Sequence, residues 1–118
     1  MKDFPKRGEV WLVNWNPARG SEQAGRRPVL VVSEEAVNQA LPIVGIIPFT
    51  SFRPGRTIFP TEMLLQKEET QLAFASIAMA HQLRTISKLR LGEYAGGIKS
   101  EETRENIRQL MRIFLDIA

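Results

Sequence analysis

Apolar and polar residues along the first half of the chain follow the short, period-two patterns that are typical of β-strands. The segment from Glu9 to Asn16 has apolar side chains on both faces of an extended chain, which predicts a strand covered on both sides for part of its length. Val29 to Val32 predicts a second, buried strand, and Ile43 to Phe49 predicts a third that ends at Thr50. Between them, Ser33 to Ala40 fits a short helical turn or a loop.

The centre of the chain is less regular. The Pro54-Gly55 pair predicts a turn, with Arg53 and Arg56 flanking it on an exposed tip. A further strand is expected near Thr57 to Phe59. The segment from Leu72 to Ala80 is ambiguous on pattern alone, because its alanines suit a helix.

The carboxyl-terminal segment predicts an amphipathic helix. Ser100 suits the N-cap position, and Glu101 and Glu102 suit the positive end of the helix dipole. Apolar residues then repeat at helical spacing, at Ile107, Leu110, Met111, Phe114 and Leu115. Strands at short intervals before a terminal helix predict a mainly β fold with α, in which a small, curved antiparallel barrel packs against that helix.

The length of 118 residues, with 43% apolar and 25% charged residues, predicts a single globular domain over residues 1–118. The chain has no cysteine, which excludes a disulfide framework and a thiolate nucleophile. It shows neither the apolar core of a signal peptide nor an apolar run of bilayer-spanning length, so a cytoplasmic protein without a membrane partner is expected.

The formal net charge is +3, and the whole excess lies in residues 1–27, which hold six Lys and Arg against three Asp and Glu. This placement favours a polyanionic partner near the amino-terminal segment. A small excess is also common in proteins that have no such partner.

Four segments, RGEVWLVNWNP (7–17), RGSEQAGRRPVLVVS (19–33), IIPFTS (46–51) and QLRTIS (82–87), resemble the MazF/PemK family of toxin endoribonucleases in their order and spacing. The resemblance implies an SH3-like barrel of the CcdB/PemK type. It also favours a strand over Leu72 to Ala80 that runs into Gln82 to Ile86.

The resemblance further implies a function and partners. The family pattern is that of a type II toxin that inhibits growth by cleaving single-stranded mRNA at selected sequences, leaving 2′,3′-cyclic phosphate and 5′-hydroxyl ends. It implies a homodimer that an acidic, MazE-like antitoxin neutralises with a tail in the RNA groove. No cofactor or metal is expected, because no cluster of His, Asp or Glu has the spacing of a metal site.

RNA cleavage without a metal requires positive charge at the phosphate in the transition state, and a guanidinium supplies it at any working pH. By the resemblance, Arg27 is the catalytic arginine and Arg26 a variable neighbour, while Thr50 is the catalytic threonine and Ser51 shares its task. Outside the family pattern, an arginine before a strand is usually a surface residue, and a threonine at a strand end reflects β-propensity.

The other candidate RNA contacts come from the loop before the second strand, from the predicted turn and from the QLRTIS region, and they are Arg19, Ser21, Glu22, Gln23, Arg53, His81 and Gln82. The Ser-Glu-Gln run of the loop equally fits a turn whose side chains cap their own backbone.

The single histidine, His81, excludes a two-histidine mechanism within one subunit. It stands where relatives often carry an acid, and if it faces the cleft, it is a candidate proton shuttle that would make activity vary across about pH 5–8. Arg84 is expected to pair with an acid within the barrel, and Ser87 to affect only a turn or helix cap. Among the aromatic residues, Phe52 is expected to be the exposed one, available for base stacking.

Two other functions remain open at this point. A related toxin class of the same barrel fold, resembling CcdB, poisons DNA gyrase by binding alone and needs neither the RGSEQAGRRP loop nor Thr50. An inactive family member that only binds antitoxin is the third possibility, because catalytic groups can be present without being correctly oriented.

Overall fold

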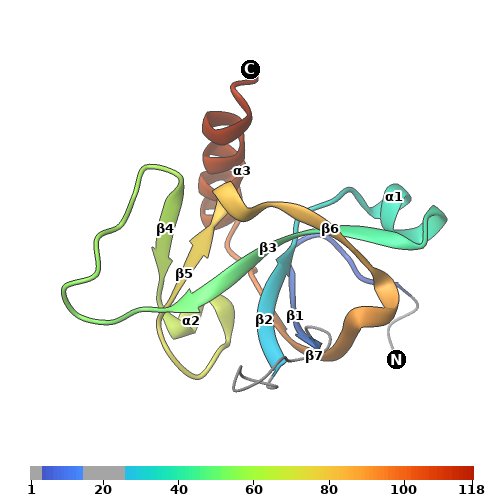
Figure 1. Ribbon diagram of the computed structural model, residues 1–118, viewed down its shortest axis with the longest axis horizontal. Coiled ribbons are helices and arrows are strands. Elements are labelled where there is room, and N and C mark those ends of the chain that lie inside the picture. Colours follow the sequence, from blue (N-terminus) through green and yellow to red (C-terminus); the bar gives the residue numbers. More distant parts are fainter. Residues whose placement is uncertain (1–3, 15–25) are drawn as a thin grey trace, which may run out of the picture.

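The computed structural model describes residues 4–14 and 26–118. Within them, the strands are β1 (Glu9–Asn14), β2 (Arg26–Val31), β3 (Ile43–Ser51), β4 (Glu62–Leu65), β5 (Ser76–Met79), β6 (Arg84–Ser87) and β7 (Leu91–Gly97). The helices are α1 (Glu35–Ala40), α2 (Lys67–Thr70) and α3 (Glu101–Leu115), with single 3₁₀ turns η1 (Ala80–Gln82) and η2 (Lys88–Arg90). The described strands are antiparallel, in the order β4-β5-β3-β2-β1-β7, and β6 lies beside β3 (Figure 1).

Strand β3 organises the whole sheet, because it pairs with three other strands. Its first residues, Ile43–Ile46, pair with β6, and its last residues, Phe49–Ser51, pair with β5. On its other edge, Ile46–Pro48 pairs with β2. The sheet therefore changes partners along a single strand and curves into the expected small barrel with a terminal helix.

Apolar side chains on both faces of β1 and β2 are buried, as the pattern of the first strand predicts. Val10 and Leu30 belong to a core that includes Ile107 of α3, whereas Val13 and Val29 belong to a second core inside the curved sheet. All four strand residues are at most 2% exposed. One face of the sheet thus packs against α3, and the other face encloses the second core because the sheet curves around it (Figure 1).

The terminal helix begins where the sequence predicts. The Oγ atom of Ser100 accepts a hydrogen bond from the Thr103 N–H at 3.2 Å, which satisfies one free donor of the first turn. Ile107 and Leu110 are buried, but Phe114 and Leu115 in the last turn are more than two-fifths exposed. Within this chain, only the first part of the apolar stripe packs against the barrel.

Three boundary predictions are wrong. The expected strand at Thr57 to Phe59 does not form, and the next strand begins only at Glu62. The Phe59 N–H and carbonyl are bonded to Glu62 instead of to a neighbouring strand. The strand expected over Leu72 to Ala80 covers only Ser76–Met79, and a 3₁₀ turn separates it from β6.

The third correction concerns Arg27, which lies inside β2 rather than before it. Arg26, Arg27 and Pro28 pair with β1, where Arg27 lies opposite Val13. The following proline restricts Arg27 to extended conformations, which suits a strand residue.

Helix α2 and strand β7 have no counterpart in the predictions. Helix α2 is a single polar turn held by reciprocal bonds between Gln66 and Glu69, with Gln71 in the left-handed region at its end. Strand β7 is glycine-rich and owes its place to pairing with β1 through two register shifts. No helix among residues 4–14 and 26–118 is long and apolar enough to cross a membrane.

Candidate functional site

A polar hollow of about 170 Å³ lies where the ends of β2, β3 and β5 meet. Residues from these strands and from the loop after β3 line it, namely Arg27, Pro28, Phe49, Thr50, Ser51, Arg53 and Ser76. The hollow therefore brings together four of the residues that the sequence singles out, Arg27, Thr50, Ser51 and Arg53.

Arg27 reaches the hollow because of its place on β2. Side chains alternate between the two faces of a strand, so Arg26 and Arg27 point in opposite directions. Arg26 forms an ion pair with Glu93 of β7, on the far side of β1. Arg27 is exposed and lines the hollow. Of the two adjacent arginines, only Arg27 therefore faces the cluster of hydroxyl groups.

Thr50 is held by the pairing of β3 with its neighbours. It lies opposite Ile77 of β5, and its side chain is half-buried. On the other edge of β3, the ladder with β2 ends where Val29 lies opposite Pro48. Arg27 and Thr50 each lie two residues beyond that pair on their own strands, and both line the hollow.

Arg53 enters the hollow from the β3–β4 loop, which comprises residues 52–61. Gly55 has φ +87°, and the Arg56 N–H donates to the Arg53 carbonyl at 3.1 Å, so residues 53–56 form a type II turn. This confirms the predicted turn. The prediction that both flanking arginines are exposed is correct for Arg53 and wrong for Arg56, which binds the buried Glu62 carboxylate.

Ser76 is a site residue that sequence reasoning missed. It is 5% exposed, lies opposite Ser51 in the ladder and donates from Oγ to the Phe74 carbonyl at 3.1 Å. In the sequence, Ser76 only precedes the apolar residues Ile77 and Ala78, and nothing in this pattern indicates a site residue. Only the pairing of β5 with the end of β3 reveals it.

The electrostatics of the hollow are one-sided. Two guanidinium groups, from Arg27 and Arg53, face three hydroxyl side chains, and none of the described residues that line it is acidic. Guanidinium and hydroxyl donors are the groups that bind phosphate oxygens. The volume is below that of most pockets for drug-sized ligands.

His81 and Gln82 lie elsewhere, on the 3₁₀ turn η1, and they are not among the described residues that line the hollow. The His81 Nδ1 atom lies 3.0 Å from the Thr61 hydroxyl, and its Nε2 atom lies 3.9 Å from a Glu62 carboxylate oxygen. Gln82 is exposed and contacts the Met79 sulfur. A proton-shuttle role for His81 stays a prediction.

Several expectations fall outside the described residues. The loop candidates Arg19, Ser21, Glu22 and Gln23 all lie in the segment 15–25.

Arg84 is exposed on β6, opposite Ile46, and its expected acidic partner stays a prediction.

The prediction that Phe52 is the exposed aromatic residue is wrong. Phe52 is half-buried, whereas Phe59 in the same loop is 54% exposed. Phe74, in the loop before β5, is 73% exposed. In these two loops, Phe59 and Phe74 are therefore the exposed aromatic residues, and Phe52 is not.

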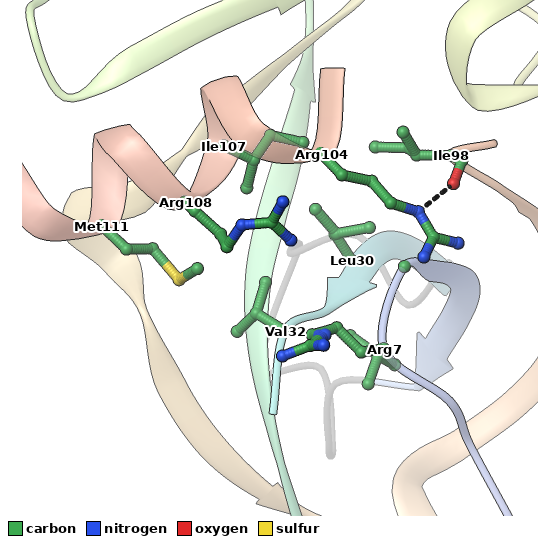
Figure 2. A pocket seen from close by; sticks show the side chains of 10 residues that line it. Arg7, Leu30, Val32, Ile98, Arg104, Ile107, Arg108 and Met111 are labelled. Carbon is green, nitrogen blue, oxygen red and sulfur yellow. Dashed lines mark hydrogen bonds between the residues drawn. The ribbon is translucent and has the colours of Figure 1, made fainter. Parts of the chain in front are cut away.

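A second pocket lies between α3 and β2 (Figure 2). Leu30, Val32 and Met111 supply apolar walls, and Arg104 turns its guanidinium aside to donate to the Ile98 carbonyl at 2.6 Å. Its volume of about 30 Å³ is far too small for a nucleotide. This pocket is a gap in the packing of the helix on the sheet, and the hollow at Arg27 is the better candidate site.

Among residues 4–14 and 26–118, no three His, Asp or Glu side chains gather as a metal site would require.

A sequence profile of the family described as PemK-like, MazF-like toxin of type II toxin-antitoxin system matches residues 6–114. The chain belongs to this toxin family. Its matched residues include β2 and β3, the two strands that supply Arg27 and Thr50 to the hollow.

Solved structures of other proteins share this fold. MazF from Deinococcus radiodurans is 26% identical, with a TM-score of 0.74 over 98% of this chain and 100% of that one. An endoribonuclease from a mycobacterial species is 25% identical, with a TM-score of 0.73 over 96% and 92%. A mycobacterial endoribonuclease solved in complex with its cognate antitoxin is 21% identical, with a TM-score of 0.77 over 99% of this chain and 98% of that one.

Proposed function

We propose that this toxin is a metal-independent endoribonuclease that cleaves single-stranded RNA, including mRNA, at selected sequences. The observation that carries the proposal is the hollow that joins Arg27 and Arg53 to the hydroxyls of Thr50 and Ser51. The activity named for the mycobacterial endoribonuclease of 25% identity supports the same reaction class.

In the proposed reaction, the 2′-hydroxyl oxygen bonds to the adjacent phosphorus while the bond from phosphorus to the 5′-oxygen breaks. The 2′-hydroxyl loses a proton and the 5′-oxygen gains one, so the products are a 2′,3′-cyclic phosphate and a 5′-hydroxyl end. Negative charge accumulates on the nonbridging phosphate oxygens, where Arg27 and Arg53 stabilise it and the Thr50 hydroxyl donates a hydrogen bond. Arg27 and Thr50 are the proposed catalytic residues, and Ser51 and Arg53 bind the RNA backbone.

The remaining RNA contacts of the proposal are Arg19, Ser21, Glu22, Gln23, His81 and Gln82, and they rest on the sequence and not on the hollow. The proposal includes a homodimer in the cytoplasm, where mRNA lies. It also includes an acidic antitoxin whose tail occupies the same positively charged hollow. A solved relative in complex with its cognate antitoxin supports such a partner.

The decisive test uses the purified protein with a long RNA of defined sequence. The 5′ ends are mapped after digestion by the wild type and by Arg27→Ala, with and without EDTA. Cleavage at a recurring short sequence, unaffected by EDTA and lost in Arg27→Ala while the fold persists, supports the proposal. Intact RNA together with inhibition of DNA gyrase would establish the CcdB-like rival, and intact RNA with antitoxin binding alone would indicate an inactive family member.

A further inference from the structure

Outside the hollow, a buried and fully paired carboxylate, that of Glu62, lies at the start of β4. Its side chain is 1% exposed. Arg56 donates to it through both terminal nitrogens, at 2.8 Å and 2.9 Å, and the Phe59 N–H donates to Oε1 at 3.0 Å. The Arg56 hydrogen bonds hold the pKa of Glu62 below its usual range despite its burial, so the carboxylate is ionised at neutral pH.

These bonds tie the second half of the β3–β4 loop to the barrel. Arg56 and Phe59 belong to the loop, and the Glu62 N–H also donates back to the Phe59 carbonyl at 2.9 Å. The other end of the loop is fixed by the Phe52 N–H, which donates to the Ala75 carbonyl at 3.1 Å. The loop, which extends away from the rest of the chain in Figure 1, is therefore anchored near both ends.

The anchoring reaches Arg53 through one hydrogen-bonded turn. Glu62 fixes the Arg56 side chain, and the Arg56 N–H holds the Arg53 carbonyl at 3.1 Å. Arg53 itself lines the hollow beside Thr50. The carboxylate of Glu62 is thus connected to the backbone of Arg53 by a short series of hydrogen bonds, without lining the hollow itself.

We infer that Glu62 is a positioning residue for RNA binding, which acts by holding Arg53 in the hollow through Arg56. The inference rests on the proposed function, because it assigns the phosphate of an RNA strand as the ligand of Arg53. It adds a buried acid, remote from the phosphate, on which the affinity of the site depends.

The sign of the effect separates positioning from simple electrostatics. Replacing Glu62 by glutamine removes a negative charge, and a more positive protein attracts RNA more strongly. Positioning predicts the opposite, because a loosened loop withdraws Arg53. Glu105→Gln is the matched control, since Glu105 binds Arg108 and Arg112 on α3 and none of these residues lines the hollow.

The experiment is a double-mutant cycle on Arg53→Gln and Glu62→Gln, with a fluorescent, mixed-sequence 2′-O-methyl RNA that cannot be cleaved. Affinity is measured at several salt concentrations. Each single variant is expected to weaken binding about tenfold and to lower the salt slope by about 0.7, which corresponds to one lost phosphate contact. The double variant is expected to match Arg53→Gln alone, because Glu62 acts through that arginine. Glu105→Gln is expected to bind as tightly as the wild type or slightly more tightly.

Additive losses, or binding by Glu62→Gln as tight as that of the wild type, would overturn the inference. Should Glu62→Gln fail to fold, the same cycle is run with Arg56→Gln, whose side chain is 28% exposed. Because this variant removes a positive charge, only its lack of additivity with Arg53→Gln supports the inference, and additive losses overturn it. If the wild type binds this RNA but leaves cleavable RNA intact, the proposed endoribonuclease activity is refuted. The double-mutant cycle still tests the role of Glu62, because it measures binding alone. A wild type that does not bind RNA overturns both proposals.

Discussion

Arg26 and Arg27 are adjacent in the sequence, yet the first is paired with Glu93 of β7 while the second lines the hollow with Thr50. Because strand geometry separates them, each serves as a control for the other. Arg27→Ala is expected to reduce kcat/KM for RNA cleavage by about 100- to 1,000-fold, the usual effect of removing one donor to transition-state charge. Arg26→Ala is expected to change it less than about threefold, because its ion pair is exposed. Equal losses in the two variants, measured with one fluorogenic RNA, would contradict the assignment of Arg27.

The hydroxyl of Thr50 is expected to matter through its hydrogen bond and not through its shape. Thr50→Val keeps the branched side chain that suits β3 but removes the donor, so we expect a loss of about 10- to 100-fold in kcat. Thr50→Ser restores the donor and is expected to retain most of the activity. Single-turnover cleavage at saturating protein measures the difference, and a Val variant as active as the Ser variant would argue against a catalytic hydroxyl.

Metal removal is expected to leave cleavage unchanged. The proposed chemistry draws its positive charge from the guanidinium groups of Arg27 and Arg53 and not from a metal ion. The initial rate should therefore agree within experimental error in EDTA and in Mg²⁺ at matched ionic strength. Salt has to be matched, because RNA binding itself weakens as salt rises. Restoration of a lost rate by added Mg²⁺ would refute a metal-independent mechanism.

Stability at acid pH is expected to depend on Glu62. Its pKa is lowered in the folded protein, mainly by the Arg56 hydrogen bonds, so the folded state gains stability above the unfolded-state pKa of about 4.3. This gain is lost as the pH falls from about 5 through the folded-state pKa. Urea unfolding between pH 3 and pH 7 should show a smaller acid loss in Glu62→Gln than in the wild type. Parallel curves for the two proteins would show that the pair contributes nothing.

The cap of α3 offers a test of stability that leaves the hollow untouched. Ser100→Ala removes the oxygen that accepts from the Thr103 N–H, and it is expected to lower the free energy of unfolding by about 1 kcal/mol. Ser100→Asp restores an acceptor and adds charge at the positive end of the helix, so its stability should return close to that of the wild type. Thermal unfolding followed by circular dichroism compares the three proteins, and cleavage activity below the transition should be equal in all of them.

The elements that the sequence predicts well are those in which local pattern and tertiary packing agree. Strands β1 to β3 carry apolar residues at strand spacing, and α3 combines a serine cap with a helical stripe, so burial follows directly from the pattern. Strand β7 is different, because a segment rich in glycine has little pattern of its own and forms a strand only against β1. Helix α2 is too short to carry a helical period.

The residues of the candidate site likewise include some that the sequence predicts and some that it does not. Arg27, Thr50 and Arg53 could be predicted because they lie in segments with a family resemblance or a recognisable turn. Ser76 could not, since its place depends on which strand pairs with the end of β3. Arg56 was misplaced on an exposed tip, because its buried partner Glu62 lies six residues away across an irregular loop that no local rule connects.

Strand β3 pairs with β2, β6 and β5 along its nine residues, and it ends in the hydroxyls of the hollow. A slip of one residue in this strand would turn Thr50 to the opposite face and expose its buried neighbours at the same time. The register of β3 therefore sets both the packing of the core and the position of Thr50. Among spontaneous mutations that let a host survive this toxin, changes at Val44, Ile46 or Ile47 should arise alongside changes at Arg27, although none of the three β3 side chains lines the hollow.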